Sequence, residues 1–374
     1  MEAHSVNEDQ ASTIYSRLTA AFAISVEQLH TAYFAMVMST GIISIDCKLI
    51  GYDSLADYLF ILNICIYLWL LVLTAARIRF YPKRFFADLI DHSRGVGFFT
   101  LVAASGVLGN QFILIGQNYE LSRYLWYLCI GLWLGFTYFI FTSFTVKENK
   151  PTLELGINGG WLLAVVATQS VSTLGSLLTQ HLHSGQQETV FFSLCMWLCG
   201  GMLYIWLIAL IFYRYTFFNF SPSDFSPPYW INMGAVSITT LAGTRLISNA
   251  DAFPFLQELM PFLKGFTMFF WATGTWWIPM LFFLGIWRHF YKRYPFSYDP
   301  LYWGLVFPLG MYTACTYHLA RVLHLQFLYA IPNYFFYVAL SAWVVIFCAL
   351  LHNLTQSIIR AFAPVQPLSR THLK

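Results

Sequence analysis

Long apolar segments follow one another through almost the whole chain, separated by short polar connectors. Ten such segments lie at about residues 29–47, 57–76, 95–116, 122–146, 157–178, 190–213, 229–248, 261–287, 302–320 and 332–354. A helix of about 20 residues crosses the roughly 30 Å hydrocarbon core of a bilayer. The sequence therefore predicts an all-α integral membrane protein with ten transmembrane helices and no separate soluble domain.

The composition agrees with a chain that is mostly surrounded by lipid. Hydrophobic residues make up 58% of the 374 residues and charged residues only 10%, whereas a soluble domain carries about 25% charge. The net charge of +3 is too small to indicate a nucleic-acid partner. The bilayer itself is the first partner that the composition predicts.

Charge placement predicts the orientation and the division of the chain. Most Lys and Arg residues lie in the connectors after even-numbered segments and in the two tails, whereas the other connectors hold only Lys48, Arg123, Lys264 and Arg321. The positive-inside rule then puts both termini in the cytoplasm. We expect a cytoplasmic tail at 1–28, a transmembrane channel or transporter domain at 29–354 and a second cytoplasmic tail at 355–374.

The odd-numbered segments are richer in small and hydroxyl-bearing residues than the even-numbered ones. Small residues let helices approach closely, and hydroxyl groups supply hydrogen bonds that lipid cannot. This contrast predicts five helical hairpins in a ring, with the odd helices inside. The candidate pore-lining residues are Ser39, Gly41, Ser105, Gly106, Ser172, Thr240, Gly243 and Thr313. The alternative is that these residues serve helix packing only.

The ninth segment, Tyr302 to Arg321, contains a proline and a glycine close together. Pro308 lacks a backbone N–H group and clashes with the preceding turn, so with Gly310 it predicts a break in the helix. Phe307 stands directly before this break. We interpret Phe307 as a partial plug of a pore; the alternative is a packing kink beside an ordinary buried phenylalanine.

Few ionisable residues lie within the apolar segments, and this argues against an enzyme. There is no nucleophile with a base, no carboxylate pair and no Cys/His group with metal-ligand spacing. We expect no catalytic residue, no cofactor, no bound metal and no disulfide. A membrane scaffold or sensor without transport activity is disfavoured because the connectors leave no room for an extramembrane domain.

The cationic residue Arg245 lies inside the seventh segment. A charge at this depth indicates function by default, and Arg245 together with Arg321 could make an outer vestibule electropositive and attract anions. The alternative is that Arg245 extends to the membrane surface. Proton-coupled transport would use an intramembrane carboxylate or histidine; His318 is the candidate, and Asp46 lies close to the outer end of its segment.

Three stretches resemble the tellurite-resistance/dicarboxylate transporter family, which is related to plant slow anion channels, yeast malate permease and sulfite exporters. They are YFAMVMSTGIIS (Tyr33–Ser44), GGWLLAVVATQSVSTLG (Gly159–Gly175) and YWGLVFPLGMY (Tyr302–Tyr312). The resemblance implies a quasi-fivefold ring of helical hairpins around a central pore, a homotrimer with one pore in each subunit, and Phe307 as the residue that occludes the pore.

The resemblance leaves the substrate open, because family members carry chloride, nitrate, sulfite or C4-dicarboxylates. We expect channel-like transport of small monovalent anions or C4-dicarboxylates across a bacterial inner membrane. The alternative is a proton-coupled secondary carrier for malate or other C4-dicarboxylates, for sulfite, or for tellurite efflux.

Overall fold

The computed structural model describes residues 19, 22–296 and 298–362, and over these residues the chain is helical without strands. Each of the ten predicted segments is a helix. Five helices, here called the buried helices, are shorter and enclosed: α2 (Ala35–Ile50), α5 (Phe99–Leu114), α8 (Leu163–Leu178), α10 (Ile231–Asn249) and α13 (Trp303–Val322). Five longer helices alternate with them along the chain: α3 (Asp53–Phe80), α6 (Tyr119–Val146), α9 (Gln186–Phe217), α12 (Met260–Ile286) and α14 (Ala330–Phe362).

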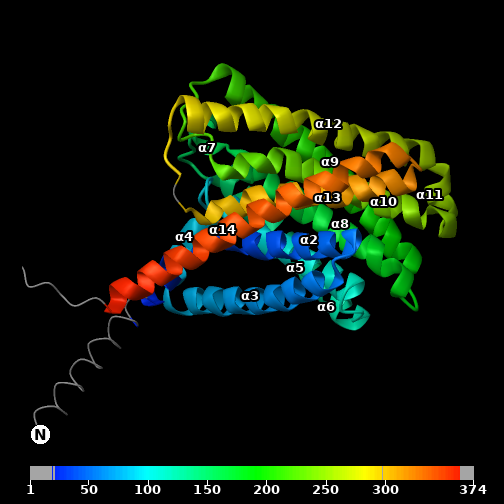
Figure 1. The fold of residues 1–374 in the computed structure, drawn as a ribbon, viewed down its shortest axis with the longest axis horizontal. Coiled ribbons are helices and arrows are strands. Elements are labelled where there is room, and N and C mark those ends of the chain that lie inside the picture. The colour runs from blue at the N-terminus through cyan, green and yellow to red at the C-terminus, as the bar shows by residue number, and fades with distance from the viewer. Residues whose placement is uncertain (1–18, 20–21, 297, 363–374) are drawn as a thin grey trace, which may run out of the picture.

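The buried helices contact one another in a closed cycle. Helix α2 packs on α5, α5 on α8, α8 on α10, α10 on α13, and α13 again on α2. Each buried helix also packs against the next long helix in the chain. In Figure 1, α12 and α3 lie on opposite sides of the molecule, with α2 and α13 between them. The short helices α4 (Pro82–Leu89), α7 (Leu153–Gly156) and α11 (Pro254–Glu258) lie in connectors.

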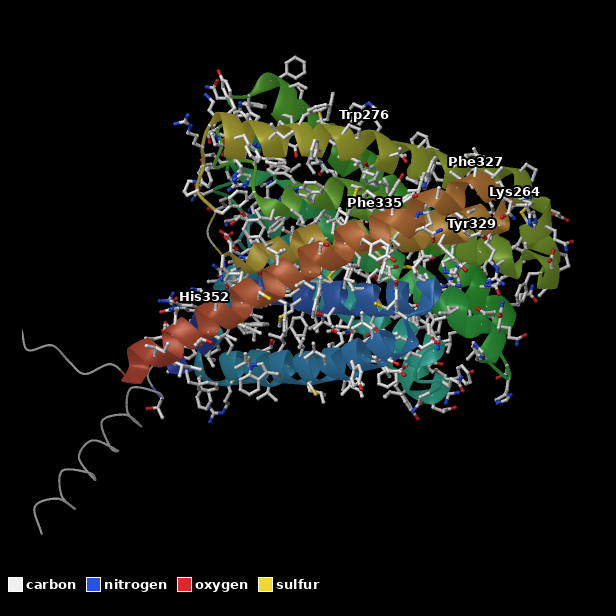
Figure 2. All side chains as sticks on the ribbon, viewed as in Figure 1. Lys264, Trp276, Phe327, Tyr329, Phe335 and His352 are labelled. Atoms are coloured by element: carbon white, nitrogen blue, oxygen red, sulfur yellow. The ribbon has the colours of Figure 1, made fainter. Side chains whose placement is uncertain are left out.

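The long helices present apolar side chains to the surroundings. Trp276 of α12 and Phe327 before α14 lie on the outside in Figure 2, and their exposed fractions are 55% and 72%. Among the described residues, eight helices are long and apolar enough to cross a membrane. Helices α10 and α13 fall outside this set because polar residues, including Arg245 and His318, lower their mean hydropathy.

A short 3₁₀ turn precedes each of the five buried helices. These turns are η1 (Thr31–Phe34), η2 (Gly95–Phe98), η3 (Gly159–Leu162), η5 (Pro227–Trp230) and η8 (Pro300–Tyr302). They contact one another in the same cyclic order as the helices. At Gly97 a Cβ atom would collide with the Thr31 hydroxyl, so glycine lets η1 and η2 meet. The N-terminal ends of all five buried helices therefore converge at one end of the molecule.

Helix α13 differs from the expectation of a break at Pro308 and Gly310. It is continuous from Trp303 to Val322 with Pro308 inside it. The hydroxyl of Ser39 donates a 2.7 Å hydrogen bond to the carbonyl of Trp303, which ties the first turn of α13 to α2. The ring of Pro308 packs against α10, where Gly234 leaves space for it. Packing on both sides thus holds the proline within a helix.

The tails lie largely outside the described residues. Residues 22–27 of the predicted tail at 1–28 are helical. At the other end, α14 continues to Phe362, beyond the end of the span predicted at residue 354. The hydrophobic pattern therefore marked the apolar part of this helix, whereas the helix itself extends into the segment predicted as tail.

Candidate functional site

A cavity of about 210 Å³ lies where the N-terminal ends of the buried helices converge. All five helices or their 3₁₀ turns line it, so we call it the N-terminal cavity. Its lining includes Ala35, Met38, Gly97, Gly160, Ile231 and Phe307. Helix N-termini carry unpaired N–H groups and the positive end of the helix dipole, which favour anions. Five such ends around one cavity make an environment suited to negative charge.

A second, much smaller cavity of about 20 Å³ lies further along the same five helices. Its lining residues follow those of the N-terminal cavity by two helical turns, as the pairs Ala35/Ile42 and Ile231/Ile238 illustrate. We call it the C-terminal cavity. All five buried helices thus line both cavities, and the two cavities share one axis through the middle of the helix cycle.

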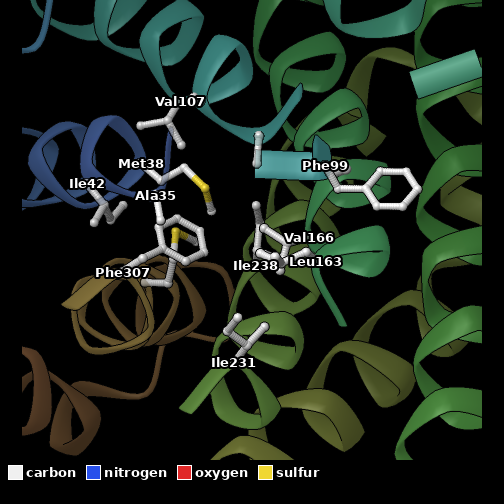
Figure 3. Packing of buried hydrophobic residues seen from close by; sticks show 14 of the residues in the cluster. Ala35, Met38, Ile42, Phe99, Val107, Leu163, Val166, Ile231, Ile238 and Phe307 are labelled. Carbon is white, nitrogen blue, oxygen red and sulfur yellow. The ribbon is translucent and has the colours of Figure 1, made fainter. Parts of the chain in front are cut away.

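Phe307 lines the N-terminal cavity at its end nearest the C-terminal cavity. Its side chain is 1% exposed and lines the N-terminal cavity together with Ala35 and Met38. Figure 3 shows the ring beside these two residues, with Ile42 close by. On α13, Met311 is the next lining residue, one turn beyond Phe307, and it belongs to the C-terminal cavity. Apolar side chains therefore separate the two cavities.

The C-terminal cavity contains a cation without an acidic partner. Arg245 of α10 lines it, and its Nη2 atom lies 3.1 Å from Nε2 of His318 in α13. Arginine has donors only, so Nε2 accepts this hydrogen bond and the proton of the neutral ring is on Nδ1. The Nε atom of Arg245 is buried without a hydrogen-bond partner, and no salt bridge to Arg245 occurs within residues 22–296 and 298–362.

The mouth of the N-terminal cavity carries a second group of charges. Asp88 of α4 bridges two cations, with its oxygens 2.6 Å from Arg77 Nη2 and 2.8 Å from Arg94 Nε. One carboxylate therefore faces two guanidinium groups, and the group keeps a net positive charge. Since Arg94 also lines the N-terminal cavity, this charge adds to the field of the helix N-termini.

His30 caps the first turn beside the same mouth. Its Nδ1 atom accepts a 3.1 Å hydrogen bond from the backbone N–H group of Ala32. Burial, and next the nearby Arg94 guanidinium, lower the pKa of His30 to about 4. The imidazole is therefore neutral at physiological pH and acts as a cap, not as a further cation.

The five predicted hydroxyl residues lie within the buried helices but line neither cavity. Ser39 bonds to the carbonyl of Trp303, and Ser105 lies 2.7 Å from the hydroxyl of Tyr67 in α3. Ser172 donates to a carbonyl of α9, while Thr240 and Thr313 donate to carbonyls of their own helices. These hydroxyl groups join neighbouring helices or satisfy backbone carbonyls of their own helix.

The three predicted glycines lie at helix–helix contacts. A Cβ atom at Gly41 would meet Val107 of α5 at 2.5 Å, one at Gly106 would meet Ser170 of α8 at 2.8 Å, and one at Gly243 would collide with Thr267 of α12. None of the three lines either cavity. Their placement matches the packing alternative.

Of the two predicted anion-attracting residues, the structure brings only Arg245 to the axis. Arg321 is exposed at the end of α13, as is Lys264 on α12. Lys264 lies at the same end of the molecule as Phe327 and Tyr329 in Figure 2. Arg321 and Lys264 therefore contribute, at most, a diffuse positive field around the C-terminal end.

Several lining residues were not singled out from the sequence. Met38, Asn110 and Thr173 line the cavities, but the small-residue pattern does not distinguish them from their neighbours. The repeat of lining positions every two turns is the signal that could have found them. Glycines or prolines at the start of four of the buried helices were a second signal, since they mark the 3₁₀ turns η2, η3, η5 and η8.

The chain is similar to a known protein family and to several membrane proteins. Residues 28–351 match the SLAC1 family, whose description is voltage-dependent anion channel. An uncharacterized transporter of Methanocaldococcus jannaschii is 27% identical over 330 residues, covering 86% of this chain and 93% of the relative. A sulfite efflux pump of Trichophyton rubrum is 24% identical over 351 residues, covering 87% and 90%. An uncharacterized membrane protein of Mycobacterium tuberculosis is 38% identical over 159 residues, covering 42% and 80%.

The family match covers most of the chain and all five buried helices. The resemblance found in the sequence is thereby confirmed, and the protein is a multi-pass membrane protein of a family of channels and transporters, not of enzymes. With the helix cycle, the two coaxial cavities and this match together, the chain belongs to the SLAC1 family of anion channels and transporters.

Proposed function

We propose that the protein carries small monovalent anions along the axis of its five buried helices. The path runs through the N-terminal cavity, past Phe307, and through the C-terminal cavity beside Arg245. In this proposal all ten helices cross the membrane as five hairpins in a ring, and Phe307 is the gate. The described conformation corresponds to the closed state, because apolar side chains fill the space between the cavities.

The observation that carries this proposal is the pair of cavities on either side of Phe307. Both are lined by all five buried helices, as expected for two ends of one interrupted path. A hydrophobic constriction stops ions by excluding water from the path. Rotation of the Phe307 side chain, or a shift of α13, would join the two cavities.

Electrostatics favour anions over cations on this path. Five helix N-termini and the cluster of Arg77, Arg94 and Asp88 surround the N-terminal cavity, and Arg245 lies at the C-terminal cavity. No acidic residue lines either cavity within the described part of the chain. A cation would therefore meet repulsion at both ends of the path.

The volume of the N-terminal cavity and the similarity to a sulfite efflux pump limit the range of candidate substrates. A cavity of about 210 Å³ accepts a small hydrated anion, and a relative of similar length is a sulfite efflux pump. We propose chloride, nitrate and sulfite or bisulfite as the substrates to test first, with C4-dicarboxylates second. Tellurite efflux is a further candidate in the same panel.

The proposal includes the setting of the protein. We propose that the N-terminal cavity faces the cytoplasm, that both termini are cytoplasmic, and that the membrane is the bacterial inner membrane; the positive-inside distribution of Lys and Arg supports this orientation. We also propose a homotrimer with a separate path in each subunit. The exposed aromatic side chains of the long helices, such as Trp206 and Phe283, provide apolar surface for lipid or for neighbouring subunits.

The test is an anion-flux panel with the purified protein in liposomes. Chloride, nitrate, sulfite and malate are offered at two pH values, with an impermeant cation and a fixed membrane potential. Flux of the small anions that follows the membrane potential and does not saturate supports the channel. Saturable uptake driven by a pH gradient supports a proton-coupled carrier instead, and absence of anion flux above protein-free liposomes contradicts both.

A further inference from the structure

A buried carboxyl group in α2 has no role in the path described so far. Asp46 is 0% exposed, and neither of its carboxyl oxygens has a hydrogen-bond partner. It takes part in no salt bridge within the described residues. An ionised carboxylate without partners is very costly in an apolar interior, whereas the neutral acid costs much less. The closed conformation therefore favours Asp46 with a proton bound.

The carboxyl group lies at the contact between α2 and α13, beside the proposed path. A Cβ atom on Gly310 would be 3.1 Å from Oδ2 of Asp46 and 2.7 Å from Cγ2 of Ile42. Gly310 follows Phe307 by one helical turn, and Ile42 lines the C-terminal cavity together with Ile45. Asp46 is thus next to two lining residues of its own helix and close to the turn that carries the gate.

Among the described residues, no charged side chain forms an ion pair with Asp46. The titratable groups near it are the thiols of Cys47 on α2 and Cys315 on α13. Helices α3, α5 and α14 also pack against α2, and none of their described residues forms a hydrogen bond or ion pair with Asp46. Arg245 and His318 line the neighbouring C-terminal cavity but are bonded to each other.

We propose that Asp46 is a proton-binding site that controls anion passage. With the proton bound, Arg245 is the only charged group among the described residues that line the C-terminal cavity, and the path favours anions. When the carboxyl O–H bond breaks and the proton passes to water, the carboxylate places a negative charge beside the path. This charge opposes Arg245, repels the anion and disturbs the contact between α2 and α13. Anion passage therefore requires the protonated site.

This inference rests on the proposed function and predicts a specific pH dependence. Flux of a strong-acid anion such as nitrate, whose own charge does not change with pH, rises on acidification. Above the midpoint, flux falls by about tenfold for each pH unit, because one proton is lost from one site. Below the midpoint, the flux is constant.

The test compares wild type with Asp46→Asn and Asp46→Glu in liposomes across a pH series. The amide of Asn has the shape of the protonated acid and cannot ionise, so Asp46→Asn is expected to pass nitrate equally at every pH, at the level of the acidic limit of the wild type. Asp46→Glu keeps an acid and is expected to keep the pH dependence. The inference is overturned if nitrate flux through Asp46→Asn depends on pH as it does in the wild type. It is also overturned if His318→Gln loses this pH dependence.

A second measurement does not depend on flux. Infrared difference spectra of the wild type between acidic and alkaline pH are expected to contain the C=O stretch of a protonated carboxylic acid without hydrogen bonds, and Asp46→Asn is expected to lack it. Absence of this band in the wild type overturns the inference even where Asp46→Asn fails to fold. Phe307→Ala, assayed in parallel, separates the two ideas. If Phe307→Ala increases nitrate flux but Asp46→Asn leaves its pH dependence unchanged, only the proton-binding site is rejected. If no variant passes nitrate, the proposed function is rejected.

Discussion

The guanidinium group of Arg245 in α10 donates a 3.1 Å hydrogen bond from Nη2 to Nε2 of His318 in α13. The two residues lie on adjacent buried helices and both line the C-terminal cavity. The neutral histidine orients the guanidinium group and leaves its positive charge in place. A carboxylate at the same position would have cancelled that charge. Arg245 is thereby held at the axis, not extended toward the membrane surface.

Replacing Arg245 by Gln is expected to lower anion flux and to weaken the preference for anions over cations. One charge beside a partly buried path is worth roughly 1–2 kcal/mol for a passing ion, which corresponds to a loss of about tenfold. The measurements are nitrate flux in liposomes and the anion-to-cation permeability ratio. Arg245→Lys keeps the charge and serves as the matched control. Equal selectivity in Arg245→Gln and wild type would mean that Arg245 does not act on the permeating ion.

Replacing Phe307 by Ala is expected to raise anion flux by roughly tenfold or more, because removing the ring connects the two cavities and admits water. Phe307→Leu is expected to give a smaller increase, since the leucine side chain still fills part of the constriction. Flux is measured in liposomes with the amount of inserted protein determined in each sample.

The control for this change is Phe99→Ala. Phe99 of α5 is also fully buried, but it lines neither cavity and points away from Phe307 in Figure 3. Its loss creates a cavity, which costs about 3–5 kcal/mol of stability, without opening the path. Equal flux increases in the two variants would indicate general loosening of the helices, and an unchanged flux in Phe307→Ala would exclude the gate.

Gly234 is expected to be essential for the contact between α10 and α13. A Cβ atom there would lie 2.7 Å from Cγ of Pro308, which belongs to a rigid ring. Gly234→Ala should therefore lower the free energy of unfolding by about 1–3 kcal/mol. The midpoint of thermal unfolding in detergent, followed by circular dichroism, measures this change.

The matched control is Gly135→Ala in α6, where a Cβ atom would meet no atom within 4 Å. Alanine favours helix over glycine by about 1 kcal/mol, so this variant should be as stable as wild type or slightly more stable. A Gly234→Ala variant as stable as Gly135→Ala would show that α10 and α13 can separate without cost.

His30 is expected to make stability depend on pH. Its pKa is lowered from 6.5 to about 4 by burial and by Arg94, so the unfolded chain takes up a proton at a higher pH than the folded protein does. The contribution is complete above pH 6.5 and is lost as the pH falls toward 4. Since the side chain is partly exposed, we expect a loss of about 1–2 kcal/mol over this range.

The measurement is the midpoint of thermal unfolding in detergent as the pH is lowered from neutral to acidic values. His30→Gln, which keeps an acceptor for the Ala32 N–H group, should lose less stability on acidification than wild type. His183→Gln, which changes an exposed histidine, should behave like wild type. Identical pH profiles for wild type and His30→Gln would contradict the prediction.

The positions of the helices and the identity of the enclosed ones could be predicted from the sequence, because both depend on the composition of local segments. Apolar runs predicted the helices, and the small residues of the odd-numbered segments predicted which five helices are enclosed. Small side chains are needed where helices pack closely. The number of small residues in a segment therefore indicates whether its helix is enclosed by other helices. The importance of Arg245 was readable for a similar reason, since a cation within an apolar segment is costly wherever it points.

The sequence did not predict which side chains of the buried helices face the axis. An amphipathic helix reveals its buried face through periodicity, but nearly every position of α5, α8 and α10 is buried. Without an exposed face, the pattern does not tell the axis from the neighbouring helices. Ser105 and Ser172 were therefore predicted at the pore, whereas they bond to Tyr67 and to the carbonyl of Ser193 in long helices.

The sequence by itself determined that this chain builds an all-helical membrane protein in which long apolar helices alternate with five enclosed ones, because hydrophobicity and residue size act locally. Only the tertiary structure decided what faces the axis: apolar residues at the constriction, with Arg245 and His318 beyond it. It also decided that Pro308 lies within a continuous helix and that Asp46 is fully enclosed. These features depend on the rotation of each helix, which is fixed by contacts between residues far apart in the chain.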